Sequence, residues 1–384
     1  MKRIAACLSL VLCAGATPTT MPANYNAFGI GVLARLSTES KTQNVFISPV
    51  SIGVALAMAA AGAKGPTRAA MLHTLGVNVP DLNAANAALI AELKDNTDAS
   101  VGIADALWTS SDVKPRAQYV RMLQQQFAAN AQALHFGDPS AAAAINAWTK
   151  QHTLGLIDRI IDRTNDSDFV YLTNALAFKG TWTQQFKKSD THPGPFTNAD
   201  GSRSTVQMMS QSAQFDVYEG NDMRALRMPY GKGGYAAYVL LPNGGDADAL
   251  VKNLNAATFE RITRGAKPSF VAISVPRFTA QYTTSLVPLL RAMGMGVAFL
   301  DSADFSGIHA IPPHLAITSV NHASYVQVDE EGTTAAAATS VGIGLLAIRR
   351  PDKTFVVDRP FVLALRDERT GSLLFIGEIR TLHA

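Results

Sequence analysis

The chain has 384 residues, of which 47% are hydrophobic and 16% charged, so it can bury a substantial core. Its 33 Lys and Arg nearly balance its 30 Asp and Glu, and the net charge is +3. The basic residues are scattered, which argues against nucleic acid as the main partner, and no segment after the first residues is long and apolar enough to span a bilayer.

Residues 1–16 predict a secretory signal peptide of bacterial type. Lys2 and Arg3 precede an apolar run, and the small residues Ala14 to Ala16 offer a cleavage site. We therefore expect a protein that is secreted or periplasmic, with a single mature domain over residues 17–384.

Both cysteines lie inside this leader, so we expect no disulfide in the mature chain. In an alternative interpretation the leader is a lipoprotein signal, and a lipid attached to Cys13 anchors the protein to a membrane. Leu12, just before it, is bulkier than a lipoprotein signal normally accepts, which favours simple secretion. Cys7 has no such alternative.

Apolar periodicity predicts helices through the first third of the chain, including one that is apolar nearly all round and hence buried. Strands, turns and further helices follow, and the chain ends in a hairpin joined through Thr370 and Gly371. The expected helices are 23–36, 52–63, one that starts at Pro66, 84–94, 119–128, 139–161 and 283–293. The expected strands are 103–109, 169–179, 270–278, 315–328, 361–366 and 373–379.

The sequence contains no complete motif of the common enzyme classes. The sequence lacks a G-x-S-x-G elbow, an H-E-x-x-H pair and a complete nucleotide-binding fingerprint. Ser111 and Lys114 match S-x-x-K without its companion motifs, and the eight histidines show no zinc-ligand spacing. We expect no catalytic residues, no metal and no cofactor.

The most informative stretch runs from Asp329 to Ile343 and reads DEEGTTAAAATSVGI. Its alanines are compatible with a helix. Its flanks alternate like strands, however, and between Thr333 and Leu346 there is neither a charge nor a proline. As a strand, neither face would present a charge to desolvate. The segment could therefore be an exposed loop that is able to become a strand, with Gly332 at the bend.

This stretch resembles the reactive-loop hinge of inhibitory serpins, and motifs along residues 23 to 380 agree with that family in the expected order. The matching motifs are Asn44-Val-Phe-Ile-Ser-Pro-Val-Ser-Ile, Thr173-Asn-Ala-Leu-Ala-Phe-Lys-Gly-Thr-Trp, Ala303-Asp-Phe-Ser-Gly-Ile, Asp358-Arg-Pro-Phe and Leu374-Phe-Ile-Gly.

The resemblance implies an α+β serpin fold. It would have a large, mostly antiparallel central sheet, two smaller sheets, about eight or nine helices and an exposed reactive loop at about 330–353. It also implies a suicide substrate for a serine protease. The protease cleaves the loop and forms an acyl-enzyme, and the freed hinge then enters the central sheet and traps it.

Two sets of residues match family positions with a role in this change. The hinge consists of Glu330, Glu331, Gly332, Thr333, Thr334, Ala335, Ala336, Ala337 and Ala338. Ser48, Ser51, Asn174 and His322 match a polar cluster beneath the centre of the sheet, and Trp182 matches a large aromatic residue where the loop first enters. An ordinary buried histidine and tryptophan are the alternative reading.

The resemblance places the reactive bond sixteen residues after the first hinge glutamate, between Leu346 and Ala347. Leucine suits the apolar pocket of chymotrypsin-like, elastase-like or subtilisin-like proteases. The alternative is Arg349–Arg350, which would suit a trypsin-like protease.

The family's heparin-binding serpins carry a basic cluster near residues 84–94, and none is present here, so we expect no heparin site. We expect a monomer, and a cysteine protease remains open as a target. The rival hypothesis is a non-inhibitory serpin that binds a ligand or a partner. Thr334, Leu156 and the C-terminal Thr381-Leu-His-Ala depart from the family pattern.

Overall fold

The computed structural model describes residues 20–244, 247–310, 315–333 and 350–383. Several predictions fall outside these ranges. They concern the signal peptide with Cys7 and Cys13, the hinge residues Thr334, Ala335, Ala336, Ala337 and Ala338, and the reactive-bond residues Leu346, Ala347 and Arg349.

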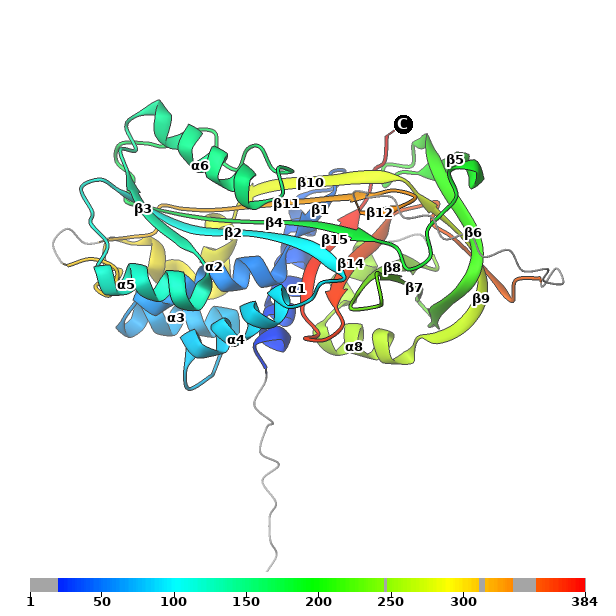
Figure 1. Cartoon of the computed structure of the whole chain (residues 1–384), viewed down its shortest axis with the longest axis horizontal. Coiled ribbons are helices and arrows are strands. Elements are labelled where there is room, and N and C mark those ends of the chain that lie inside the picture. The colour runs from blue at the N-terminus through cyan, green and yellow to red at the C-terminus, as the bar shows by residue number, and fades with distance from the viewer. Residues whose placement is uncertain (1–19, 245–246, 311–314, 334–349, 384) are drawn as a thin grey trace, which may run out of the picture.

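A long, mostly antiparallel sheet forms the centre of the molecule, with α6 on one face and a group of helices on the other (Figure 1). Within the described residues its strand order is β10-β11-β4-β2-β3, and the short β12 pairs with β4. Two neighbouring pairs, β11 with β4 and β2 with β3, are parallel. The strands are β2 (Ala99–Ser110), β3 (Asn130–Leu134), β4 (Val170–Thr181), β10 (Phe278–Ser285), β11 (Ser319–Val328) and β12 (Gly332–Thr333).

The remaining described strands form one nine-stranded sheet, in which the two smaller sheets expected from the sequence are joined through the long β6. Its strand order is β1-β15-β14-β8-β7-β6-β9-β13, and β5 pairs with β6 beside this path. In Figure 1 these strands occupy the right-hand half of the molecule, together with α8. They are β1 (Val45–Ile47), β5 (Thr191–Thr197), β6 (Arg203–Glu219), β7 (Met223–Tyr230), β8 (Tyr235–Pro242), β9 (Lys267–Pro276), β13 (Lys353–Val356), β14 (Phe361–Asp367) and β15 (Leu373–Ile379).

Helices of the described residues cover the faces of these sheets. They are α1 (Met21–Glu39), α2 (Pro49–Gly62), α3 (Gly65–Leu75), α4 (Leu82–Lys94), α5 (Ala117–Met122), α6 (Pro139–His152), α7 (Ala247–Asn253), α8 (Ala256–Gly265) and α9 (Val287–Leu290). The arrangement confirms the predicted α+β fold class. No helix among the described residues is long and apolar enough to cross a membrane.

The buried helix α2 lies beneath the central sheet because its sequence is apolar on all sides. Ser48 caps it by accepting a hydrogen bond from the Ser51 amide, and Pro49 occupies the first turn, where a missing donor costs nothing. The helix therefore places two serines at its N-terminus directly under the strands.

Two predicted helices have wrong boundaries. The helix expected over 139–161 ends at His152, because the backbone turns left-handed at Leu154 (φ 57°) and Gly155 (φ 74°). The helix expected from Thr283 begins only at Val287, because residues up to Ser285 complete the ladder between β10 and β11. Threonines favour such a strand, and Pro288 marks the first helical turn.

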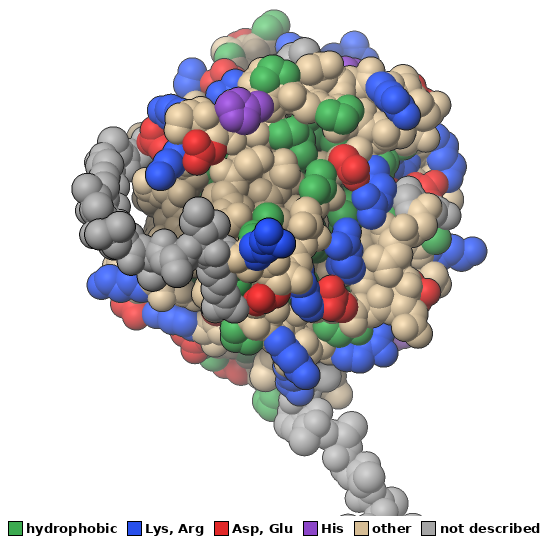
Figure 2. Space-filling view, turned by 90° about the vertical axis from the view of Figure 1, so that its right-hand side faces the viewer, with side chains coloured by type: hydrophobic (Ala, Val, Ile, Leu, Met, Phe, Trp, Pro, Cys, Tyr) green, Lys and Arg blue, Asp and Glu red, His purple; other side chains and the backbone are tan. Residues whose placement is uncertain are grey.

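Figure 2 shows the end of the molecule that carries the right-hand strands of Figure 1. Lys and Arg side chains are frequent on this face, and Asp and Glu side chains lie among them. Apolar side chains appear in a band between the charged groups.

Candidate functional site: the hinge and the polar cluster beneath the sheet

Two hinge residues, Gly332 and Thr333, already form a strand at one end of the central sheet. Gly332 and Thr333 pair antiparallel with Thr181 and Gly180 of β4. Thr333 is fully buried, and its hydroxyl lies 2.9 Å from that of Tyr230. Further along, β4 pairs directly with β11, up to Ala177. The chain therefore enters the sheet beside β4, at the point where pairing between β4 and β11 stops.

Gly332 makes this entry possible. Its φ is +148°, and a Cβ atom added there would lie 2.0 Å from the carbonyl oxygen of Gly180. Such a contact requires the backbone to shift, so the position favours glycine for both its dihedral angle and its closeness to β4.

Glu330 is held by the segment from the end of β4 to the start of β5 and by Arg277, which lies between β9 and β10. Its side chain is 5% exposed and accepts a hydrogen bond from the Thr191 hydroxyl at 2.9 Å, while Arg277 lies 3.7 Å away. The Phe186 amide donates to its carbonyl oxygen. These contacts fix the acidic end of the hinge to a segment outside the sheet.

The second hinge acid is more open. Glu331 forms an ion pair with the exposed Lys188 at 2.9 Å. Asp329 accepts hydrogen bonds from the amides of Glu331 and Gly332, and burial raises the pKa of its carboxyl group. The three acids therefore have distinct partners.

Trp182 lies where the sequence predicts an aromatic at the entry point. It is buried and stacks on Tyr230, with ring centroids 4.1 Å apart. Its indole N–H donates to the carbonyl of Asp329, and its amide donates to that of Glu331. Trp182 thus ties the end of β4 to the acidic turn.

The structure also brings the four predicted cluster residues together beneath the centre of the sheet. Asn174 and His322 are direct neighbours on β4 and β11, and His322 Nδ1 lies 2.6 Å from Asn174 Oδ1. The Ser48 amide donates to His322 Nε2 at 3.1 Å, and Ser48 Oγ accepts from Ser51 N. A role in opening the sheet stays a prediction.

These contacts define the state of the histidine. Because Nε2 accepts a hydrogen bond from the Ser48 amide, the ring is neutral, and Nδ1–H donates a hydrogen bond to Asn174 Oδ1. Burial lowers the pKa of His322 to about 3, because the charged form would lose its hydration. A positive charge at this point of the sheet is therefore unfavourable throughout the neutral range.

A depressed histidine pKa predicts a loss of stability in acid. His322 stabilises the fold fully above its unfolded pKa of about 6.5, and this stability falls by about 1.4 kcal/mol per pH unit as the pH decreases towards about 3. In urea unfolding, the advantage of the wild type over His322→Gln should shrink by that slope below pH 6.5. His192→Gln, at an exposed histidine, is the control. A constant difference between wild type and His322→Gln from pH 7 to pH 5 would contradict this account.

Sequence reasoning missed one member of the network, Asp105 on β2. It is 4% exposed, lies opposite Asn174 in the sheet, and accepts a hydrogen bond from Ser51 Oγ at 3.1 Å. Burial raises the pKa of its carboxyl group to about 8. An acid inside the apolar run from Ile103 to Thr109 is the signal that could have found it.

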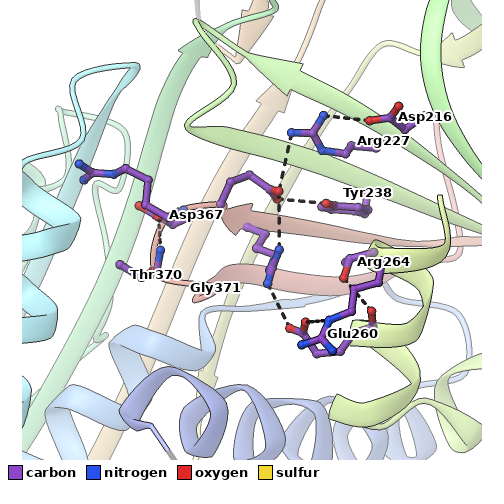
Figure 3. Close-up of polar contacts among 12 residues, drawn as sticks. Asp216, Arg227, Tyr238, Glu260, Arg264, Asp367, Thr370 and Gly371 are labelled. Atoms are coloured by element: carbon purple, nitrogen blue, oxygen red, sulfur yellow. Dashed lines mark hydrogen bonds and ion pairs between the residues drawn. The ribbon is translucent and has the colours of Figure 1, made fainter. Parts of the chain in front are cut away.

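A second charged network connects α8 with β7, β8 and the end of β14 (Figure 3). Arg366 bridges Glu260 at 3.1 Å and Glu368 at 3.6 Å, and Glu368 also accepts from Tyr238 and pairs with Arg227. Each acid of this network faces at least one cation. The arrangement anchors α8 to the sheet.

Comparison with known proteins agrees with this architecture. The family model described as serpin (serine protease inhibitor) matches residues 23–382. An uncharacterised serpin-like protein of Thermococcus kodakarensis is 33% identical over 364 residues, which cover 92% of this chain and 84% of that protein.

Two further similar proteins have names that state different activities, one inhibition and the other ligand binding. Leukocyte elastase inhibitor A of Mus musculus is 31% identical, with 92% of this chain and 97% of that protein covered. The crystal structure of human thyroxine-binding globulin complexed with thyroxine superposes with a TM-score of 0.88 at 26% identity, covering 95% of this chain and 99% of that one.

Proposed function

The chain belongs to the serpin family, and we propose that it is an inhibitor that acts as a suicide substrate for a serine protease. The protease cleaves the loop between Leu346 and Ala347 and becomes esterified to the new chain end. The hinge then enters the central sheet between β4 and β11, before the ester is hydrolysed.

The register of β12 carries this proposal. Antiparallel partners have residue numbers that add to a constant, and the two observed pairs set this constant at 513. If the same register continued along β4 after insertion, residues 332–343 would lie opposite Val170–Thr181. All of these residues lie in the stretch without charge or proline, so the whole length of β4 could be paired without burying a charge or losing a ladder donor.

The two faces of this added strand would suit the layers they meet. On one face, Ala335 and Val341 would lie beside Phe178 and Leu172, which belong to the main core. On the other, Ala338 would lie beside Ala175, in the smaller core under α6. Small residues fit there because the helix lies close over the sheet.

The polar cluster would receive a matching group. In the inserted strand, the same register would bring Thr339 beside Asn174, between Asn174 and His322. Separation of β4 from β11 breaks the hydrogen bond between those two side chains, and the threonine hydroxyl can bond to either of them. The strands can therefore part without leaving both polar groups unpaired.

Strand addition also supplies the driving force. About ten new ladder bonds at about 1 kcal/mol each give on the order of 10 kcal/mol, which is comparable to the stability of a whole domain. Serpin loop insertion is itself a standard example of strand addition and strain release. What the register of β12 contributes is the position in this chain's sheet at which insertion would occur.

Cleavage of the loop should therefore raise heat stability. For a chain of 384 residues, on the order of 10 kcal/mol corresponds to an increase in the melting temperature of about 10 °C. The measurement is thermal unfolding before and after loop nicking by a protease that is not inhibited, with the nicked site confirmed by mass spectrometry. An unchanged melting temperature after nicking would favour the non-inhibitory reading.

A ligand-binding serpin is the second candidate. The described residues form a cavity of about 340 Å³ between α1, α8 and β14, whose lining includes Ile30, Phe259 and Arg366. The guanidinium of Arg366 is already paired with two carboxylates, which weakens it as an anchor for an acidic ligand. Titration of the intact protein with an aromatic carboxylate tests this. Saturable binding that is lost in Arg366→Met would support it, and absence of binding would remove it.

We also propose export, with maturation after Ala16. The support is the leader pattern in the sequence. A mature N-terminus at Thr17 in the extracellular or periplasmic fraction would agree, whereas a lipid-modified Cys13 would favour the anchored form.

A further inference from the structure

Asp105 lies at the end of a continuous path of hydrogen bonds through the centre of the sheet. The path runs from Asn174 through His322 and the two serines of α2 to Asp105 Oδ1. It connects β4, β11 and β2 through the N-terminus of one helix. Asp105 is the group through which β2 is tied to α2.

The other carboxyl oxygen of Asp105 has no hydrogen-bond partner among the described residues, although it is buried. Asp105 lines a cavity of about 30 Å³, whose wall also includes Val54, Ile90 and Phe127. A space of this size has room for about one water molecule. Asp105 is therefore a buried acid with one direct hydrogen bond, beside a small and mainly apolar space.

No described cation forms an ion pair with this carboxyl group. The ionisable groups nearest to it are Tyr25 of α1, which interacts electrostatically with Asp105 and whose hydroxyl binds Asn86, and Lys94 of α4, which lines the same cavity. Neutral His322 of β11 is connected to it through Ser48 and Ser51. Lys94 lines the cavity but is exposed to solvent. No described residue packed around Asp105 therefore compensates the negative charge of its ionised carboxylate. The protonated, neutral form of the Asp105 side chain is favoured for this reason.

We propose that Asp105 is a proton-dependent lock on the central sheet, which holds the sheet closed while its carboxyl group is protonated and weakens it on ionisation. The ionised carboxylate needs water or a cation, and parting of the strands brings water to it. The proton passes to solvent base. Entry of the hinge into the intact protein, without cleavage, then becomes faster as the pH rises.

The sign follows from the direction of the shift. Burial raises the pKa of Asp105 from 3.8 to about 8, so the closed sheet loses this stability as the pH rises through that interval. His322 acts in the opposite sense and loses stability as the pH falls below about 6.5. The two effects oppose each other between about pH 4 and pH 6.5, so that the Asp105 effect stands alone above about pH 6.5.

The test uses the intact protein without any protease. The rate at which the native protein is lost on mild heating is measured from pH 6 to pH 9 for the wild type, Asp105→Asn and Asp158→Asn. Asp158 is a control because its side chain is 72% exposed. A group with a pKa of about 8 is about 9% ionised at pH 7 and about 91% at pH 9. Between pH 7 and pH 9 the wild-type rate should therefore rise by about tenfold relative to Asp105→Asn, and Asp158→Asn should follow the wild type.

Equal pH profiles for the wild type and Asp105→Asn would overturn the proposal. If Asp105→Asn does not fold, infrared difference spectra of the wild type provide the second measurement. The band of a protonated carboxyl group should be present at pH 6 and lost by pH 9, and its absence at pH 6 would also overturn the proposal. The pH dependence of the sheet does not rest on the proposed function, and only its effect on protease inhibition does. A failure to trap any protease would leave the pH profile unaffected.

Discussion

Replacing Thr333 with arginine should turn the protein from an inhibitor into a substrate. Thr333 is fully buried beside Gly180, and its hydroxyl contacts Tyr230. An arginine there would have to bury its guanidinium inside the sheet beside Tyr230, at a cost of several kcal/mol. Insertion of the hinge would become slower than hydrolysis of the acyl-enzyme, so the protease would be released instead of trapped. The fraction of protease trapped as a covalent complex should fall at least about tenfold, because each 1.4 kcal/mol changes a rate tenfold.

Thr333→Ser is the matched control, because it keeps the hydroxyl group that contacts Tyr230 and adds no charge. It should trap protease at close to the wild-type level. Both variants should be cleaved at the same bond, since neither changes the segment that the protease recognises. Full trapping by Thr333→Arg would show that entry at β12 does not limit inhibition.

The second large effect concerns the choice of protease. Leu346→Arg should raise the rate of trypsin inhibition at least about 100-fold and lower chymotrypsin inhibition by a similar factor. The reason is that a buried charge is rejected by an apolar specificity pocket and paired in an acidic one. The measurement is the second-order rate constant for each protease under the same conditions.

The neighbouring substitution Leu345→Arg is the control for this prediction. It adds the same charge one residue away, and it should leave the preference between the two proteases largely unchanged. If Arg349 is the reactive residue instead, Leu346→Arg will have little effect and Arg349→Leu will abolish trypsin inhibition. That result would move the reactive bond and keep the mechanism.

Much of the fold could be predicted from the sequence, because the signals were local. The apolar run of α2 and the apolar strand β4 are visible as such, and both lie where the patterns place them. Boundaries failed where a backbone angle decided the outcome. The positive φ at Leu154 lies just after the end of α6 at His152, and a leucine gives no sequence signal for a left-handed backbone.

The candidate site shows the same division. Ser48, Ser51, Asn174 and His322 could be named from family motifs, and they do lie together. Asp105 could not be assigned, because its partner Ser51 is 54 residues away and only the fold brings the two together.

The ion pairs of the hinge were also beyond sequence reasoning. Glu330 contacts Thr191 and Arg277, and Glu331 contacts Lys188. All three partners lie on segments that precede the hinge by at least fifty residues, so their proximity depends on the sheet topology. Spacing along the chain carries no trace of these contacts.

Incubation of the mature protein with chymotrypsin, elastase and trypsin, followed by a denaturing gel and mass spectrometry of the released C-terminal peptide, tests the central claim most directly. The account predicts a complex that survives denaturation and a peptide that starts at Ala347. Clean cleavage of the loop by every protease tried, with no stable complex, would contradict the inhibitory function for those targets and favour the ligand-binding alternative.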